Sequence, residues 1–149
     1  MYIKYIGALL IMCGCITLSY YYEKREKNKL MQLSNMRDFI LHIRTKIDYF
    51  LTPLHIIYSE YTNPFIMTLI NDDFNNLDFY FEKDASPLIK EFFSSVGKGL
   101  KDEEIALCDY TLSKLELIYE NNEKELKNKI KVFRTLAIFG GASVCILMI

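Results

Sequence analysis

The chain has 149 residues, enough for one domain with terminal segments, and its formal net charge is −1. Hydrophobic residues make up 51%, and the mean hydropathy of +0.07 lies at the upper edge for a globular protein. Three of the four Cys lie in apolar end segments, which excludes a domain framed by disulfides. Six Gly and three Pro leave few sites for tight turns and favour long helices.

The N-terminal segment is uncharged over residues 5–22, which read YIGALLIMCGCITLSYYY. A run of this length can span a bilayer as a helix, because a helix satisfies its own backbone polar groups. We therefore predict a transmembrane helix over residues 1–23. A cleaved signal peptide, or a lipoprotein signal ending at Cys15, is the alternative, and neither has a convincing cleavage site.

The C-terminal segment is uncharged over residues 135–149, which read TLAIFGGASVCILMI. We predict a hydrophobic segment over residues 132–149 that either crosses the bilayer or only enters it, because the run is short and ends at the chain terminus. Basic residues flank both end segments on the side of the central region: Lys24, Arg25, Lys27, Lys29, Lys127, Lys129, Lys131 and Arg134. By the positive-inside rule, the central region over residues 24–131 faces the cytoplasm, at the cell membrane.

Two apolar stripes with helical spacing bracket the central region. The first contains Leu33, Met36, Ile40, Ile43, Ile47, Phe50 and Leu54, and Thr52-Pro53 should end its helix. The second contains Ile105, Cys108, Leu112, Leu115, Tyr119, Leu126 and Phe133. It predicts a helix over residues 102–131 that continues into the C-terminal segment. We expect the two stripes to pack antiparallel.

Shorter elements are expected between the two stripes. Asn63-Pro64 should open one helix, and Ser86-Pro87 should form the N-cap and first turn of another that ends at Gly97 and Gly99. An aromatic-rich patch over residues 74–81 is expected to lie mostly in the core. The predicted fold class is all-α, an antiparallel helical bundle between an N-terminal and a short C-terminal transmembrane helix.

Charge is distributed unevenly along the central region. Residues 23–46 hold seven basic and three acidic side chains, and residues 48–123 hold fifteen acidic and five basic ones. The region is therefore basic next to the predicted membrane segments, where anionic lipids attract it, and acidic away from them. An acidic surface repels nucleic acid and suits a partner with a basic face. The candidate partner-binding residues are Asp72, Asp73, Asp78, Glu82 and Asp84.

The sequence offers no recognisable catalytic, cofactor or metal site. His42 and His55 are thirteen residues apart without paired Cys, which gives no zinc-site spacing. The Gly97-Lys98-Gly99 segment lacks the full phosphate-loop pattern and a preceding strand. We expect a protein that is not an enzyme, has no cofactor and takes no small-molecule substrate.

Several segments, in their order along the chain, resemble the stage III sporulation protein AB family. They are YIGALLI near the N-terminus, QLSNMRDFILHIRTKIDYFLTPL, FFSSVGKGL and KIKVFRTLAIFGGASVCILMI. Within them, Thr52-Pro53-Leu54, the glycine turn at Gly97, and Lys131, Arg134 and Leu136 carry the resemblance. The resemblance is weakest over residues 58–86.

The resemblance implies a helical bundle similar to the cytoplasmic domains of the platform protein of type II secretion and type IV pilus machines. It implies a non-catalytic platform protein on the mother-cell side of a secretion-like channel between mother cell and forespore. The expected partners are a secretion-type ATPase, stage III sporulation protein AA, and other membrane proteins of the channel. The alternative function is a small membrane channel or transporter subunit, against which the absence of charges within both end segments counts.

Overall fold

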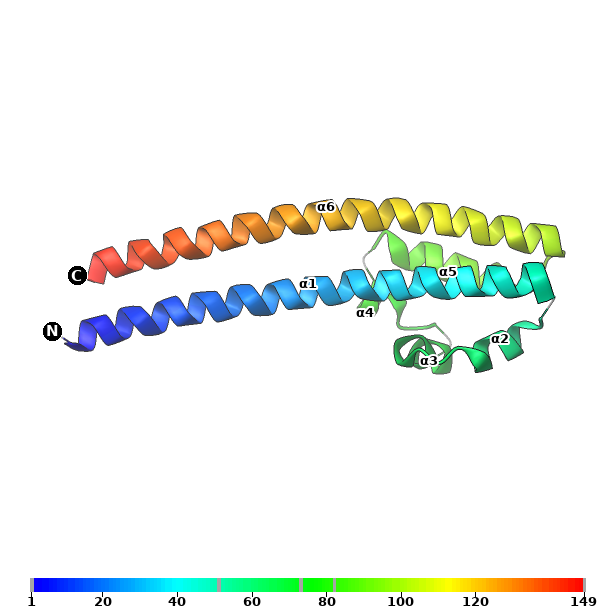
Figure 1. Ribbon diagram of the computed structural model, residues 1–149, viewed down its shortest axis with the longest axis horizontal. Coiled ribbons are helices and arrows are strands. Elements are labelled where there is room, and N and C mark those ends of the chain that lie inside the picture. The colour runs from blue at the N-terminus through cyan, green and yellow to red at the C-terminus, as the bar shows by residue number, and fades with distance from the viewer. Residues whose placement is uncertain (1, 51, 73, 82, 149) are drawn as a thin grey trace. The chain divides into compact units, whose positions relative to one another are not determined.

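The computed structural model describes residues 2–50, 52–72, 74–81 and 83–148 (Figure 1). The described helices are α1 (Tyr2–Phe50), α2 (Leu54–Glu60), α3 (Pro64–Asn71), α4 (Leu77–Tyr80), α5 (Ala85–Ser95) and α6 (Lys101–Met148). These described ranges contain no strand, which confirms the all-helical fold class. The chain divides into a bundle unit, Lys29–Asn122, and an end unit made of Met1–Asn28 and Glu123–Ile149.

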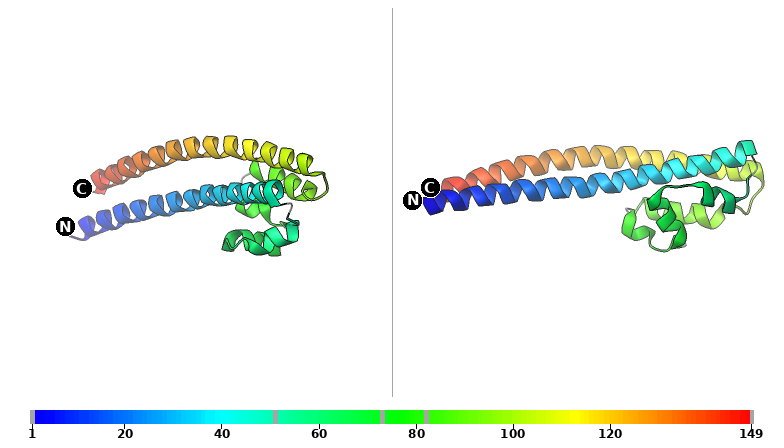
Figure 2. Two further views of the ribbon diagram at one scale, coloured as in Figure 1. Left: turned by 45° about the vertical axis from the view of Figure 1, so that its right-hand side comes forward. Right: turned by 60° about the horizontal axis from the view of Figure 1, so that its bottom comes forward.

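In the bundle unit, α1 and α6 run antiparallel, as predicted. Arg37 of α1 pairs with Glu116 of α6 at 2.6 Å. Farther along α1, Arg44 pairs at 2.6 Å with Asp109, which precedes Glu116 in α6. Residue numbers thus rise along α1 while they fall along α6. The short helices α2 to α5 lie together on one side of this pair (right-hand view of Figure 2).

The core of the bundle unit is centred on Phe39. Its ring is fully buried and lies within 4.7 Å of the ring centre of Tyr61, 5.8 Å of Tyr58 and 6.1 Å of Phe93. Phe39 thereby joins α1 to α2 and α5. The other buried apolar side chains are Leu33, Met36, Ile40, Ile43, Ile47, Ile57, Ile66, Leu69, Leu77, Phe81, Ala85, Ile89, Phe92, Val96, Cys108 and Leu115.

The predicted stripes are confirmed over most of their length. The first is buried from Leu33 to Ile47, but Phe50, the last residue of α1, is 68% exposed, and the Lys46 ammonium lies 5.5 Å from the centre of its ring. The second stripe is buried at Cys108 and Leu115, with its other members in the bundle unit only partly buried. The aromatic patch is mixed, since Phe81 is buried whereas Phe79 is 84% exposed.

The predicted start of α3 is confirmed, and that of α5 is wrong by two residues. Asn63 caps α3, because its Oδ1 accepts hydrogen bonds from the backbone N–H groups of Phe65 and Ile66 at 3.0 and 3.4 Å. Ser86, predicted as the N-cap of α5, lies inside that helix. Its hydroxyl donates to Asp78 instead of capping.

In the end unit, the first part of α1 and the last part of α6 form a second antiparallel pair. The rings of Tyr22 and Phe133 stack at 5.0 Å, and Arg134 pairs with Glu23 at 2.7 Å. The continuity of α6 to Met148 confirms the predicted extension of the rod into the C-terminal segment.

Large apolar side chains of the end unit are mostly exposed. Those above 60% exposure are Ile6, Leu9, Leu10, Ile16, Leu18, Tyr20, Tyr21, Leu136, Ile138, Phe139 and Ile146. Among the described residues, no helix combines the length and the apolar character that a membrane crossing requires. The two membrane segments stay predictions.

Candidate functional site

The predicted acidic residues lie along the segment that contains α3, α4 and α5. Asp72 follows α3, and its Oδ2 accepts a hydrogen bond from the Asn76 side chain. Asp78 in α4 accepts the Ser86 hydroxyl and so ties α4 to α5. Asp84 is exposed and precedes α5. The two remaining candidates, Asp73 and Glu82, lie outside the described residues.

The described ion pairs of the bundle unit lie elsewhere. They join α1 to α6 through Arg37–Glu116, Arg44–Asp109 and Lys101–Asp48, and α1 to α2 through Lys46–Glu60. In the part of the chain that the structure describes, no ion pair includes Asp72, Asp78 or Asp84. The side chains that donate to Asp72 and Asp78, those of Asn76 and Ser86, are neutral.

The basic partners of two paired acids lower the pKa values of those acids. The Arg44 guanidinium donates to both carboxylate oxygens of Asp109, at 2.6 and 3.2 Å, and lowers the pKa of that carboxyl. The Lys46 ammonium, 2.6 Å from Glu60, likewise lowers the pKa of Glu60. These ion pairs join α1 to α6 and α1 to α2, and their acidic members lie outside the α3–α5 segment.

The turn between α5 and α6 is held by one buried carboxylate. Glu104, in the first turn of α6, is 6% exposed, and its Oε1 accepts the backbone N–H groups of Gly97 and Gly99, both at 2.8 Å. Gly97 has a φ of 85°, a left-handed conformation that favours glycine. A Cβ at this position would lie 2.4 Å from Cδ1 of Leu54. The turn therefore requires glycine at position 97 on two grounds.

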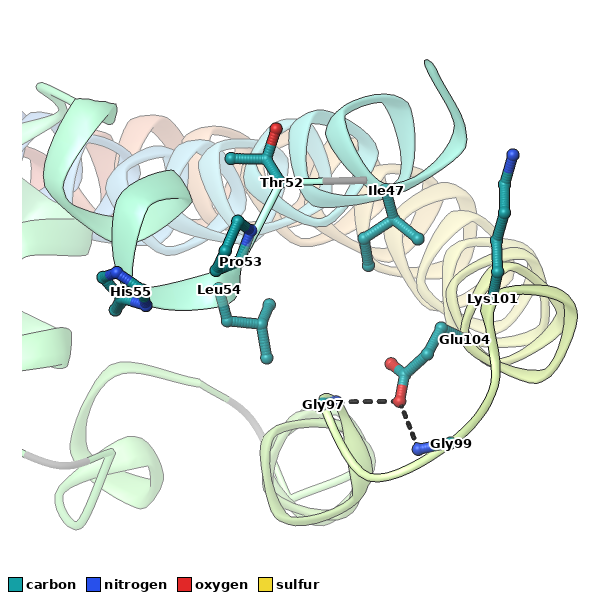
Figure 3. A pocket seen from close by; sticks show the side chains of 9 residues that line it. All are labelled: Ile47, Thr52, Pro53, Leu54, His55, Gly97, Gly99, Lys101 and Glu104. Atoms are coloured by element: carbon teal, nitrogen blue, oxygen red, sulfur yellow. Dashed lines mark hydrogen bonds between the residues drawn. The ribbon is translucent and has the colours of Figure 1, made fainter. Parts of the chain in front are cut away.

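A cavity of about 410 Å³ lies beside this turn (Figure 3). It brings together the Thr52-Pro53-Leu54 triplet and the glycine turn, two of the segments on which the family resemblance rests. The residues that line it are Ile47, Thr52, Pro53, Leu54, His55, Gly97, Gly99, Lys101 and Glu104. The sequence does not reveal this site, because Asp102, Glu103 and Glu104 are consecutive acids and only the fold buries Glu104.

A second hollow, of about 490 Å³, lies in the end unit and is largely apolar. It is lined by Cys15, Leu18, Tyr21, Tyr22, Arg25, Phe133, Leu136 and Ala137. Arg25 supplies its one formal charge, so the hollow offers contacts for an apolar group next to a cation.

Three titratable groups of the bundle unit have pKa values shifted toward their uncharged forms. Burial raises the pKa of the Cys108 thiol to about 12, and it raises the pKa of Tyr58 to about 12. Burial, together with the nearby Lys46, lowers the pKa of His42. These are the responses expected of groups that the fold removes from water.

Comparison with known proteins gives one match. A family model described as stage III sporulation protein AB matches residues 4–64 and 67–149. The match therefore includes most of residues 58–86, where the resemblance in the sequence is weakest. Neither the curated proteins nor the solved structures gave a match.

Proposed function

Because the chain belongs to the stage III sporulation protein AB family, we propose that it is a non-catalytic, membrane-anchored adaptor of a sporulation-specific secretion-like channel. In this role it couples a cytoplasmic secretion-type ATPase to the membrane proteins of the channel between mother cell and forespore. The bundle unit binds the ATPase, and the end unit holds the protein at the mother-cell membrane.

The observation that carries the proposal is the acidic surface on the α3–α5 segment. The bundle unit has its own core, and among the described residues none of its ion pairs includes Asp72, Asp78 or Asp84. A folded helical unit with an unbalanced acidic surface is suited to binding a basic surface of another protein.

The exposed apolar side chains of the end unit support attachment to a membrane. A soluble protein rarely exposes a contiguous set of large apolar residues, and such a set marks contact with lipid or another protein. The basic residues beside both uncharged stretches, among them Lys24 and Arg134, favour a cytoplasmic bundle unit. The C-terminal segment either crosses the bilayer or dips into it.

The ATPase part of the proposal is tested by binding of the full chain, in detergent, to the cognate ATPase. Reversing the charges of Asp72, Asp78 and Asp84 to Lys should slow association roughly tenfold or more, because the attraction that steers encounter is removed. Asp84→Lys alone should already slow association, whereas Glu120→Lys, the matched single reversal of an exposed acid on α6, should leave it nearly unchanged. Equal association of both variants with the ATPase would remove the acidic surface from the proposal.

The membrane part is tested separately with a topology reporter fused after Ile149. Resistance of the protein to carbonate extraction is expected in either topology. A reporter outside the cytoplasm means that both end segments cross the bilayer, and a cytoplasmic reporter means that only the first does. Release of the protein by carbonate would contradict insertion.

A further inference from the structure

The carboxylate of Glu104 makes only half of the hydrogen bonds available to it. Its Oε1 accepts from both glycines of the turn, but its Oε2 is buried and has no hydrogen-bond partner in the described part of the chain. A buried carboxylate oxygen without a partner is costly, so a donor that reaches it is bound favourably. Figure 3 shows this oxygen turned away from the glycines, on the side of Ile47 and Leu54.

Lys101 lines the same cavity but does not form an ion pair with this carboxylate. Lys101 stands three residues before Glu104, the spacing at which helix residues commonly pair. Its ammonium instead lies 2.6 Å from the backbone oxygen of Asp48 and 3.3 Å from the Asp48 carboxylate. Figure 3 shows the Lys101 side chain extending away from Glu104. Within the part of the chain that the structure describes, no ion pair includes Glu104.

The walls of the cavity are apolar on the way to Glu104. Ile47, Pro53 and Leu54 supply hydrocarbon surface, and Thr52 and His55 add polar groups. A ligand that fits both features has an aliphatic stem and a cationic end that donates hydrogen bonds. Lysine and arginine side chains have this form, and Arg donors pair especially well with carboxylates.

We propose that the cavity receives a basic side chain from a partner protein, whose charged end pairs with Oε2 of Glu104. The stem packs on Ile47 and Pro53, and the Leu54 side chain, which is only partly buried, turns aside to admit it. The excess of acidic residues over positions 48–123 attracts such a basic segment. Identifying the partner as the ATPase rests on the proposed function, whereas the site itself does not.

The experiment uses the full chain, labelled with ¹⁵N at its six glycines, in non-ionic detergent. Butylguanidinium chloride is titrated, with N-butylurea as a neutral probe of the same shape. We expect butylguanidinium to shift the amide signals of Gly97 and Gly99, whose N–H groups bind the same carboxylate. Gly7, Gly14, Gly140 and Gly141, in the end unit, should not move. Equal shifts with both probes, or no saturable shift at Gly97 and Gly99, would overturn the proposal.

Two variants test whether the Glu104 side chain itself binds butylguanidinium. Glu104→Gln keeps an oxygen to accept from the two glycines but removes the charge, and it should weaken butylguanidinium binding about tenfold. Glu103→Gln removes a neighbouring exposed charge and should leave binding nearly unchanged. Equal weakening by both variants would mean that the overall negative charge attracts butylguanidinium without a specific site at Glu104, and this result would contradict the proposal.

Should Glu104→Gln fail to fold, the comparison of the two probes on the wild type still decides the question. Since no ATPase is present, a negative result here leaves the proposed function standing. A positive result with no ATPase binding rejects only the proposed function.

Discussion

Replacing Gly97 by alanine tests how the turn between α5 and α6 is built. The left-handed conformation costs an L-residue roughly 1–2 kcal/mol. The new Cβ would lie 2.4 Å from Cδ1 of Leu54, the far end of a flexible, partly buried side chain, and moving this side chain adds about 0.5–1 kcal/mol. The reduced freedom of the unfolded chain returns about 0.4–1 kcal/mol. Gly97→Ala should therefore destabilise the bundle unit by about 1–2 kcal/mol.

The measurement is urea unfolding of the full chain in non-ionic detergent, followed by near-ultraviolet circular dichroism. This signal arises from packed aromatic rings, such as the cluster of Phe39, Tyr58 and Tyr61 in the bundle unit. Gly140→Ala is the control, because a Cβ there meets no atom within 4 Å. The control should not lower the midpoint of the transition.

A double-mutant cycle separates the two contributions. In a Leu54→Ala background the atom that collides with the new Cβ is absent, so Gly97→Ala should cost only the conformational part, about 1 kcal/mol. An unchanged cost in that background would refute the steric argument. A cost near zero in the wild type would refute the whole account of the turn.

Three further outcomes are expected. Phe92→Ala should destabilise the bundle unit by about 3–5 kcal/mol in the same urea assay, because the ring is 1% exposed, and a loss below about 1 kcal/mol would contradict this packing. Arg44 lowers the pKa of Asp109 in the folded protein. Their ion pair therefore stabilises the fold fully at pH values above the ordinary carboxyl pKa of about 4, and this stabilisation is lost as the pH falls through the lowered pKa of Asp109. Asp109→Asn should thus be less stable than the wild type near pH 7, with the difference shrinking in acid; a difference independent of pH would contradict the pairing. Cys108 should resist iodoacetamide in the native protein near pH 8 and react once urea unfolds the unit, as measured by mass spectrometry, since burial raises its pKa to about 12.

Periodic patterns were enough to predict the parts of the long helices that lie in the bundle unit. The stripe from Leu33 to Ile47 repeats at helical spacing, so it identified both the helix and its buried face. The cap at Asn63 was also predictable, because the capping side chain and the Pro after it act within one turn. The start of α5 was not, because the Ser86 hydroxyl binds Asp78, and the sequence does not show that α4 and α5 pack together.

The site beside the turn could not be predicted from local sequence. Asp102, Glu103 and Glu104 look equivalent as acids at a helix start, and only the fold selects Glu104 for burial. The Gly97-Lys98-Gly99 segment was correctly placed at a helix end, yet the carboxylate that binds it lies beyond it in the next helix. The cavity also needs Ile47 and Leu54 from a distant part of the chain. Contacts between residues so far apart in the chain produce no periodic pattern in the sequence.

The antiparallel pairing of α1 with α6 has a consequence for how the protein is made on the ribosome. Arg37 and its partner Glu116 are 79 positions apart, so the face of α1 that includes Met36 and Ile40 emerges long before the helix that covers it. During synthesis this apolar face remains open to solvent or to a chaperone, because long-range contacts form last. The bundle unit can close only after residue 122 has left the exit tunnel. Pauses in translation before that point would lengthen the interval in which nascent chains can aggregate.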